Sequence, residues 1–364
     1  MKHIFRIGAA AVAVGWAVHA MAAGGELHIY NWSDYIAKDT VARFEKETGI
    51  KVRYDVYDSD ETLQAKLLTG KSGYDLVNPS NDFLSKQIQS GVYQKLDRSK
   101  LPNWKNLDPA LLAKFAASDP GNAYSVPYMW GTTTIGINVD KVKAALGADY
   151  PANEWELLYN PKYVSKLKRC GVSVLNSGND VFPSVLRYIG KSPVSTSLND
   201  YKEAAKTLEA VRPYITRFNS SSYINEMANG ELCLALGYSG DLLIANQRAK
   251  EAKNGVRIKV IIPKTGATLW ANMMAIPKDA KNVEAAHKFL DFIMRPDVVA
   301  DISNQVFYAN ANKAATPLVN KAISGDPNVY PNDAIKQVLW TRNVQPADVQ
   351  RGVTRLWTTV KTGR

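Results

Sequence analysis

Short apolar runs of two different periods alternate along the first part of the chain. Apolar residues alternate or cluster over a few positions, as in strands, at residues 27–30, 51–56 and 74–77. They recur with helical spacing at residues 40–48 and 62–68. Gly49 is a typical residue to end the first of these helices. This alternation of strands and helices predicts an α/β fold.

The pattern continues in a second segment and then leads back to the first. In residues 131–247 we expect strands at 171–175 and 232–236. Helices should begin near Val139 and span residues 182–188 and 223–228. The returning part would contain strands at 256–263 and 270–277 and a helix at 284–294, and helices in 327–357 would rejoin the second domain. Residues 127–136 and 306–312 are the expected crossings between the two domains.

Carboxylates and aromatic rings follow several predicted strands. The residues in these expected loops are Trp32, Asp34, Tyr35, Asp82, Asp180, Tyr238 and Asp241. Ligands of open α/β sheets lie beyond the carboxyl ends of the strands. A ring face beside a carboxylate suits an organic ammonium group, because the ring face and the carboxylate both attract its positive charge. One alternative is an ordinary loop with a half-buried Trp32. Asp34 could instead fix its loop by accepting hydrogen bonds from backbone amides, and Asp82 could be a solvated acid.

Composition and charge are those of a soluble globular protein. The 364 residues suffice for two domains, with 46% hydrophobic and 22% charged residues. The net charge of +11 is spread along the chain without an Arg-rich run, so we expect a solvated basic surface and no nucleic-acid partner. Such a charge does not steer cations toward the protein, so local carboxylates would have to attract a cationic ligand.

The N-terminus has the pattern of a cleaved leader. Lys2 and Arg6 precede an apolar run over residues 7–18, which is too short for a membrane span. Ala20 and Ala22 fit a small-x-small cleavage site. We therefore expect a signal peptide over residues 1–23 and an exported mature protein, in which no later stretch spans a bilayer.

The two cysteines, Cys170 and Cys233, predict one disulfide in an exported chain, with two buried free thiols as the alternative. Apart from the leader, the histidines are His28 and His287, neither of which has a ligand-like spacing to a cysteine. We therefore expect no metal site and no cofactor. No plausible Ser–His–Asp set is present, and no catalytic residue is predicted, although an enzyme remains an alternative.

Several long motifs together identify a family. The segments 30–35 (YNWSDY), 128–130 (YMW), 237–241 (GYSGD) and 306–318 (VFYANANKAATPL) resemble the periplasmic polyamine-binding proteins of bacterial ABC importers. The resemblance covers essentially the whole mature chain. It implies a two-lobed type 2 periplasmic binding protein fold, with two hinge crossings and an interlobe ligand cleft. Lobe 1 would comprise residues 24–130 and 254–306, and lobe 2 would comprise 131–253 and 307–364. It also implies a Cys170–Cys233 disulfide.

The same resemblance implies a ligand site. Asp241 would anchor an amine, Trp32 and Tyr35 would cover the alkyl chain, and Tyr308 would close the site from the second crossing. The alternative for Tyr308 is hinge packing. The full expected set is Trp32, Ser33, Asp34, Tyr35, Asp82, Asp180, Tyr238, Asp241, Trp270, Asn272 and Tyr308.

Two positions depart from the family pattern. Relatives place an Asp at the position of Asn272, and often a Ser at the position of Asp82. Either the charge has moved within the site or one end of the ligand is neutral. Trp270 would also reshape the wall. Putrescine, spermidine, agmatine and a modified amine therefore remain open as ligands.

The resemblance implies a monomer in the periplasm that captures putrescine or spermidine and delivers it to the membrane permease of an ABC importer. Two alternatives remain open. One is a receptor for another amine or an amino-acid derivative, and the other is a polyamine sensor subunit.

Overall fold

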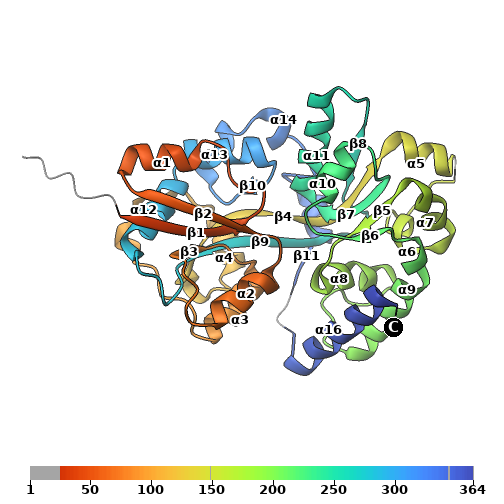
Figure 1. Cartoon of the computed structure of the whole chain (residues 1–364), viewed down its shortest axis with the longest axis horizontal. Coiled ribbons are helices and arrows are strands. Elements are labelled where there is room, and N and C mark those ends of the chain that lie inside the picture. Colours follow the sequence, from red (N-terminus) through yellow and green to blue (C-terminus); the bar gives the residue numbers. More distant parts are fainter. Residues whose placement is uncertain (1–24, 148, 343–344, 364) are drawn as a thin grey trace, which may run out of the picture.

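The computed structural model describes residues 25–147, 149–342 and 345–363. The predicted signal peptide lies outside the described residues. Two groups of elements lie side by side, joined by long strands between them (Figure 1). No helix among the described residues has the length and apolar character to cross a membrane.

The first group is built on a parallel sheet. Strand β1 (Glu26–Trp32) lies between β2 (Lys51–Tyr57) and β3 (Leu76–Val77), and all three run in the same direction. Its helices are α1 (Thr40–Thr48), α2 (Asp60–Leu68), α3 (Asn81–Gln89), α4 (Pro109–Phe115), α12 (Val283–Ile293), α13 (Pro296–Val306) and α14 (Lys321–Ser324). The predicted bounds of α1 are confirmed. Gly49 ends this helix in the left-handed conformation with φ 71°, which a Gly adopts without strain.

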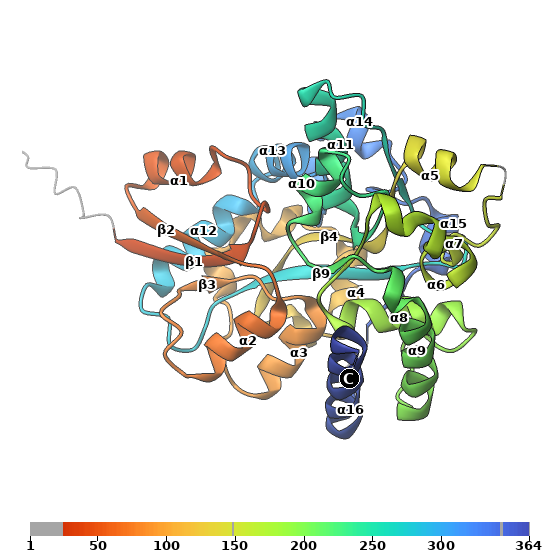
Figure 2. The ribbon, with the colours of Figure 1, turned by 45° about the vertical axis from the view of Figure 1, so that its right-hand side comes forward.

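The second group contains β5 (Val172–Val174), β6 (Arg217–Phe218), β7 (Leu234–Tyr238) and β8 (Ile258–Ile261). Its helices are α5 (Val139–Leu146), α6 (Glu156–Tyr159), α7 (Pro161–Leu167), α8 (Gly178–Tyr188), α9 (Leu198–Val211), α10 (Tyr223–Ala228), α11 (Ser239–Ala252) and α16 (Ala347–Thr362). Helix α16 packs against α8 and α9, as Figure 2 shows from a second side. The predicted disulfide between Cys170 and Cys233 is present.

Two long strands carry the chain between the groups. Strands β4 (Ser125–Asn138) and β9 (Thr268–Ala275) are antiparallel neighbours in the centre of the sheet. Buried side chains up to Trp130 of β4 belong to one hydrophobic cluster, and those from Ile135 belong to another. Ala267, which directly precedes β9, belongs to the second of these clusters, and Leu269 in β9 belongs to the first. These strands provide two of the crossings of a two-lobed α/β fold.

The final part of the chain takes a route that the sequence pattern did not predict. Strand β10 (Ala309–Asn310) pairs with β4, and side chains up to Val329 belong to the first cluster. The predicted crossing at 306–312 therefore lies within that cluster. Helix α15 (Asp333–Val338) and strand β11 (Trp340–Thr341), which pairs with β9, lead toward α16 in the second. The bounds predicted for the lobes remain a prediction.

Three expected loops are helical instead. Asp82, Asp180 and Asp241 each lie in the first turn of a helix, α3, α8 and α11 respectively. The helices begin at or soon after the preceding strand, so little or no loop separates them. A carboxylate in a first helical turn is favoured by the partial positive charge of the helix N-terminus. The acids thus still lie at strand ends, but rigid helices position them.

Candidate functional site

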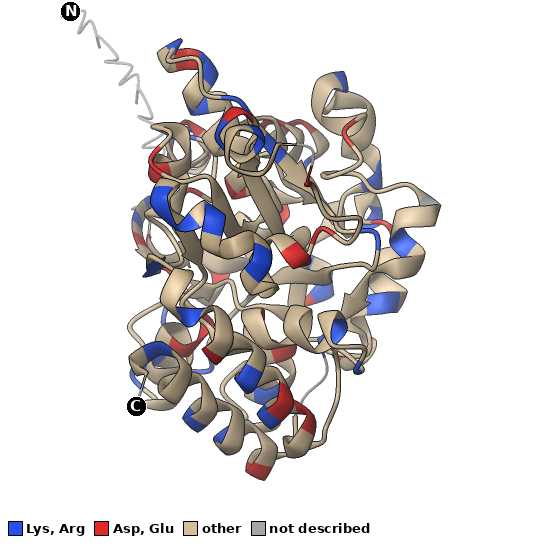
Figure 3. Ribbon diagram, turned by 90° about the vertical axis from the view of Figure 1, so that its right-hand side faces the viewer, with Lys and Arg blue, Asp and Glu red and all other residues tan. Residues whose placement is uncertain are grey.

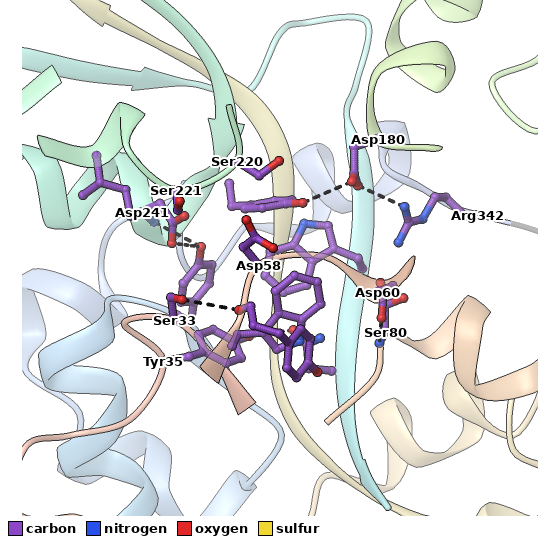
Figure 4. Close-up of a pocket in the computed structure, with 17 residues that line it drawn as sticks. Ser33, Tyr35, Asp58, Asp60, Ser80, Asp180, Ser220, Ser221, Asp241 and Arg342 are labelled. Atoms are coloured by element: carbon purple, nitrogen blue, oxygen red, sulfur yellow. Dashed lines mark hydrogen bonds and ion pairs between the residues drawn. The ribbon is translucent and has the colours of Figure 1, made fainter. Parts of the chain in front are cut away.

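A cavity of about 580 Å³, including its open mouth, lies where the two hydrophobic clusters meet (Figure 4). Most of the sequence-predicted site residues line it, namely Trp32, Ser33, Tyr35, Asp180, Tyr238, Asp241, Trp270, Asn272 and Tyr308. The cavity wall also contains residues that the sequence analysis missed, namely Tyr57, Asp58, Asp60, Ser80, Ser220, Ser221, Ile224 and Arg342.

Aromatic rings form the central walls of the cavity. The Tyr308 ring lies edge-to-face with Tyr35, at 5.1 Å between centroids, and with Trp270, at 5.4 Å. Trp270 in turn contacts Tyr238 at 5.5 Å. A Cβ atom at residue 240 would lie 2.4 Å from the Tyr308 ring, so this position requires Gly240. These walls can cover an alkyl chain and attract an ammonium group through their ring faces.

Asp241 forms one acidic end of the cavity. Its carboxylate accepts hydrogen bonds from the hydroxyl groups of Tyr308, at 2.7 Å, and Tyr223, at 2.8 Å. Burial raises the pKa of Asp241 to about 6, although both hydroxyl groups lower it. No described Lys or Arg forms an ion pair with this carboxylate, so an ammonium ligand would supply its counter-charge.

The opposite end contains Asp60, Asp180 and Arg342 (Figure 4). Asp180 accepts hydrogen bonds from the guanidinium of Arg342, at 2.9 Å, and from the hydroxyl of Tyr238, at 3.1 Å. Burial, and then the neighbouring Asp82 carboxylate, raise the pKa of Asp60 to about 8. This end therefore combines one paired carboxylate with one that holds its proton at neutral pH.

Two sequence-predicted site residues do not line the cavity. Asp34 is exposed and forms an ion pair at 3.0 Å with Arg248 of α11, across the two groups of elements. Asp82 is buried next to the cavity and accepts hydrogen bonds from Arg342, at 2.8 Å, and from Ser80, at 2.9 Å. Ligand binding by these two acids stays a prediction.

Asn272 provides a neutral polar group in the cavity wall. Its side-chain oxygen accepts a hydrogen bond from the Tyr35 hydroxyl at 2.9 Å, and its amide nitrogen donates to the backbone oxygen of Asn78 at 3.4 Å. Trp32 donates to the same backbone oxygen through Nε1 at 2.8 Å. These bonds fix the floor of the cavity beneath the rings without adding charge.

The arrangement suits binding more than metal chemistry. Within the described ranges, no group of three or more His, Cys, Asp or Glu could hold a metal ion. On the face of the molecule that Figure 3 shows, the basic residues Lys and Arg are interspersed with the acidic residues Asp and Glu. The fold and the cavity together define a two-lobed α/β binding protein whose ligand site lies between the lobes.

Comparisons with known proteins agree with this class. Residues 39–331 match the model of the family described as bacterial extracellular solute-binding protein. The chain is 54% identical over 338 residues to the putrescine-binding periplasmic protein SpuD of Pseudomonas aeruginosa, covering 93% of this chain and 92% of SpuD. It is 55% identical over 339 residues to the putrescine-binding periplasmic protein PotF of Escherichia coli, with the same coverage of 93% and 92%.

A solved structure shows the same fold. The spermidine/putrescine ABC transporter substrate-binding protein PotD of Streptococcus pneumoniae superimposes with a TM-score of 0.74 at 26% identity, covering 93% of this chain and 99% of that protein. The fold is that of a type 2 periplasmic binding protein. The chain belongs to the bacterial extracellular solute-binding protein family.

Proposed function

We propose that this protein captures a polyamine, putrescine or spermidine in particular, between its two lobes and delivers it to an ABC importer. The observation that carries the proposal is the cavity, in which aromatic walls connect Asp241 at one end with the acids around Asp180 at the other. An alkyl polyamine has charged ends and an apolar chain. The acids match the charges, and the rings match the chain.

The relatives support this ligand class. SpuD and PotF are both described as putrescine-binding periplasmic proteins, and each matches more than nine-tenths of this chain. We infer the same compartment for this protein, with residues 1–23 as its export signal. The predicted partner is a membrane permease, and the predicted oligomeric state is a monomer without bound nucleic acid or cofactor.

We also infer that the lobes close around the ligand by bending at β4 and β9. Tyr308 from the first hydrophobic cluster contacts Asp241 on a helix of the second, so this contact spans the two sides of the cleft. A ligand that contacts both sides stabilises the closed state by its differential affinity. The bound amine would be released chemically unchanged, which distinguishes a receptor from an enzyme.

A thermal-shift panel of amines tests the proposal. At least one amine of the panel should raise the melting temperature in a concentration-dependent way, because binding stabilises the native state. The panel contains putrescine, spermidine, agmatine and cadaverine. Neutral alkanediols of matched length serve as controls and should have no effect. An unchanged melting curve across the whole panel would contradict the proposal. Mass spectrometry of the amine after long incubation would reveal any turnover.

A further inference from the structure

Arg342 introduces a positive charge into a site proposed to bind cations. It follows β11 directly, and its side chain is only 10% exposed. Its guanidinium lies 2.8 Å from Asp82 Oδ1 and 2.9 Å from Asp180 Oδ1. These two carboxylates are themselves 5% and 8% exposed, so all three groups form a buried ionic triad.

The triad joins the two sides of the cleft. Asp82 lies in α3, which belongs to the first group of elements, and Asp180 lies in α8, which belongs to the second. Although burial lowers the pKa of Arg342, the carboxylates of Asp82 and Asp180 hold it above its ordinary value. The guanidinium is therefore a permanent cation between two acids from opposite lobes.

This pairing removes Asp180 from the acids open to a ligand. One of its oxygens accepts from Arg342 and the other from the Tyr238 hydroxyl. Among described residues, no Lys or Arg pairs with the other cavity acids, Asp241, Asp58 and Asp60. Asp241 lies at one end of the cavity and Asp60 at the other (Figure 4). Because Asp60 holds its proton at neutral pH, the carboxylates left to bind ammonium groups are those of Asp241 and Asp58, and two such groups match a diamine.

We propose that Arg342 is a specificity-determining residue that occupies the place of a further ligand ammonium. Its guanidinium fills the space between Asp82 and Asp180 and repels a third positive charge. The site therefore accepts a short linear diamine and rejects a longer triamine. This inference rests on the proposed function, since it selects one ligand class among polyamines.

Calorimetric titrations with putrescine and spermidine test the inference on the wild type, Arg342→Met and Arg342→Lys. The wild type should bind putrescine at least about 10-fold more tightly than spermidine, since one extra unpaired buried charge costs several kcal/mol. Arg342→Met should shift this ratio toward spermidine by about 10-fold or more. Arg342→Lys keeps the positive charge and should largely retain the diamine preference. The exposed Arg351 on α16 provides the control Arg351→Met, which should leave the ratio unchanged.

Each outcome bears on one of the two claims. Equal binding of spermidine and putrescine by the wild type would overturn the role of Arg342 while leaving the proposed function intact. An unchanged ratio in Arg342→Met, with a normal melting curve, would do the same. Should that variant fail to fold, Arg342→Lys and the wild-type ratio still decide. Absence of binding by either amine to the wild type would contradict the proposed function, and the inference would fall with it.

Discussion

The Tyr308 hydroxyl donates a 2.7 Å hydrogen bond to the Asp241 carboxylate and also accepts one, at 3.1 Å, from the Asp241 backbone N–H. Tyr308 belongs to the first hydrophobic cluster, whereas Asp241 lies in the first turn of α11, a helix of the second. The pair therefore spans the cleft at the point where the proposed ligand carries a charge. It aligns the carboxylate and closes one end of the cavity.

Replacing Asp241 by Asn should weaken binding of putrescine by about 10-fold or more. The variant keeps the shape of the side chain but leaves a buried ammonium without its counter-charge, which typically costs about 3–5 kcal/mol. Isothermal titration calorimetry measures the change. Asp140→Asn, which removes an exposed acid paired with Arg257, provides the charge-matched control. An affinity for putrescine equal to that of this control would rule out Asp241 as the anchor.

Affinity for the amine should depend on pH through Asp241. Burial raises its pKa to about 6, and the ligand requires the ionised carboxylate. Binding should therefore weaken by nearly 10-fold per unit below pH 6, because the carboxylate must first lose a proton. Tyr308→Phe removes a hydrogen bond that lowers this pKa. In this variant the midpoint of the pH dependence of affinity should therefore move to higher pH. A flat profile between pH 5 and 7 would contradict the assignment.

Asp60 should make the stability of the ligand-free protein fall with rising pH. Its pKa is raised from 3.8 to about 8 in the fold, so the native state holds this proton more tightly than the unfolded chain. The stabilisation is complete below about pH 4 and is lost as the pH rises through about 8. Thermal melts of the wild type and Asp60→Asn across pH 5–8 measure this. The melting temperature of Asp60→Asn should fall less steeply with rising pH than that of the wild type. Identical slopes for the two proteins would argue against a raised pKa of Asp60.

Removing the disulfide should destabilise the protein without much effect on ligand binding. Cys170 and Cys233 are 63 positions apart, and a loop of that length implies about 4 kcal/mol of stabilisation in the chain-entropy model. We expect the double Cys→Ala variant to lose about 2–4 kcal/mol in urea unfolding. Neither residue lines the cavity, so putrescine affinity should stay within about 3-fold. A large loss of affinity in a folded variant would show that the disulfide acts on the site.

The local signals in the sequence predicted much of the fold. The bounds of α1 and α10 agree with the predicted ranges 40–48 and 223–228, and Gly49 ends the first of these helices as expected. The pattern did not separate strand ends from helix starts at Asp180 and Asp241, because both helices begin at or near the end of a strand. Hydrophobic periodicity marks buried faces, not the first helical turn.

The site was predictable only where residues belonged to recognisable motifs. Trp32, Asp241 and Tyr308 lie in such motifs and meet at one cavity. Arg342 had no local signal, because its burial depends on the pairing of β11 with β9, far away in the sequence. Asp60 was also missed, since its unusual environment arises from Asp82 and from burial between elements that the sequence cannot place relative to each other.

A crystal structure of the protein with bound putrescine tests the central claim most directly. We predict one ligand nitrogen within about 2.7–3.2 Å of the Asp241 carboxylate, the methylene chain against the aromatic walls, and the second nitrogen at the end formed by Asp58 and Asp60. Putrescine bound outside the interlobe cavity, or inside it with neither nitrogen in contact with Asp241, would contradict the account.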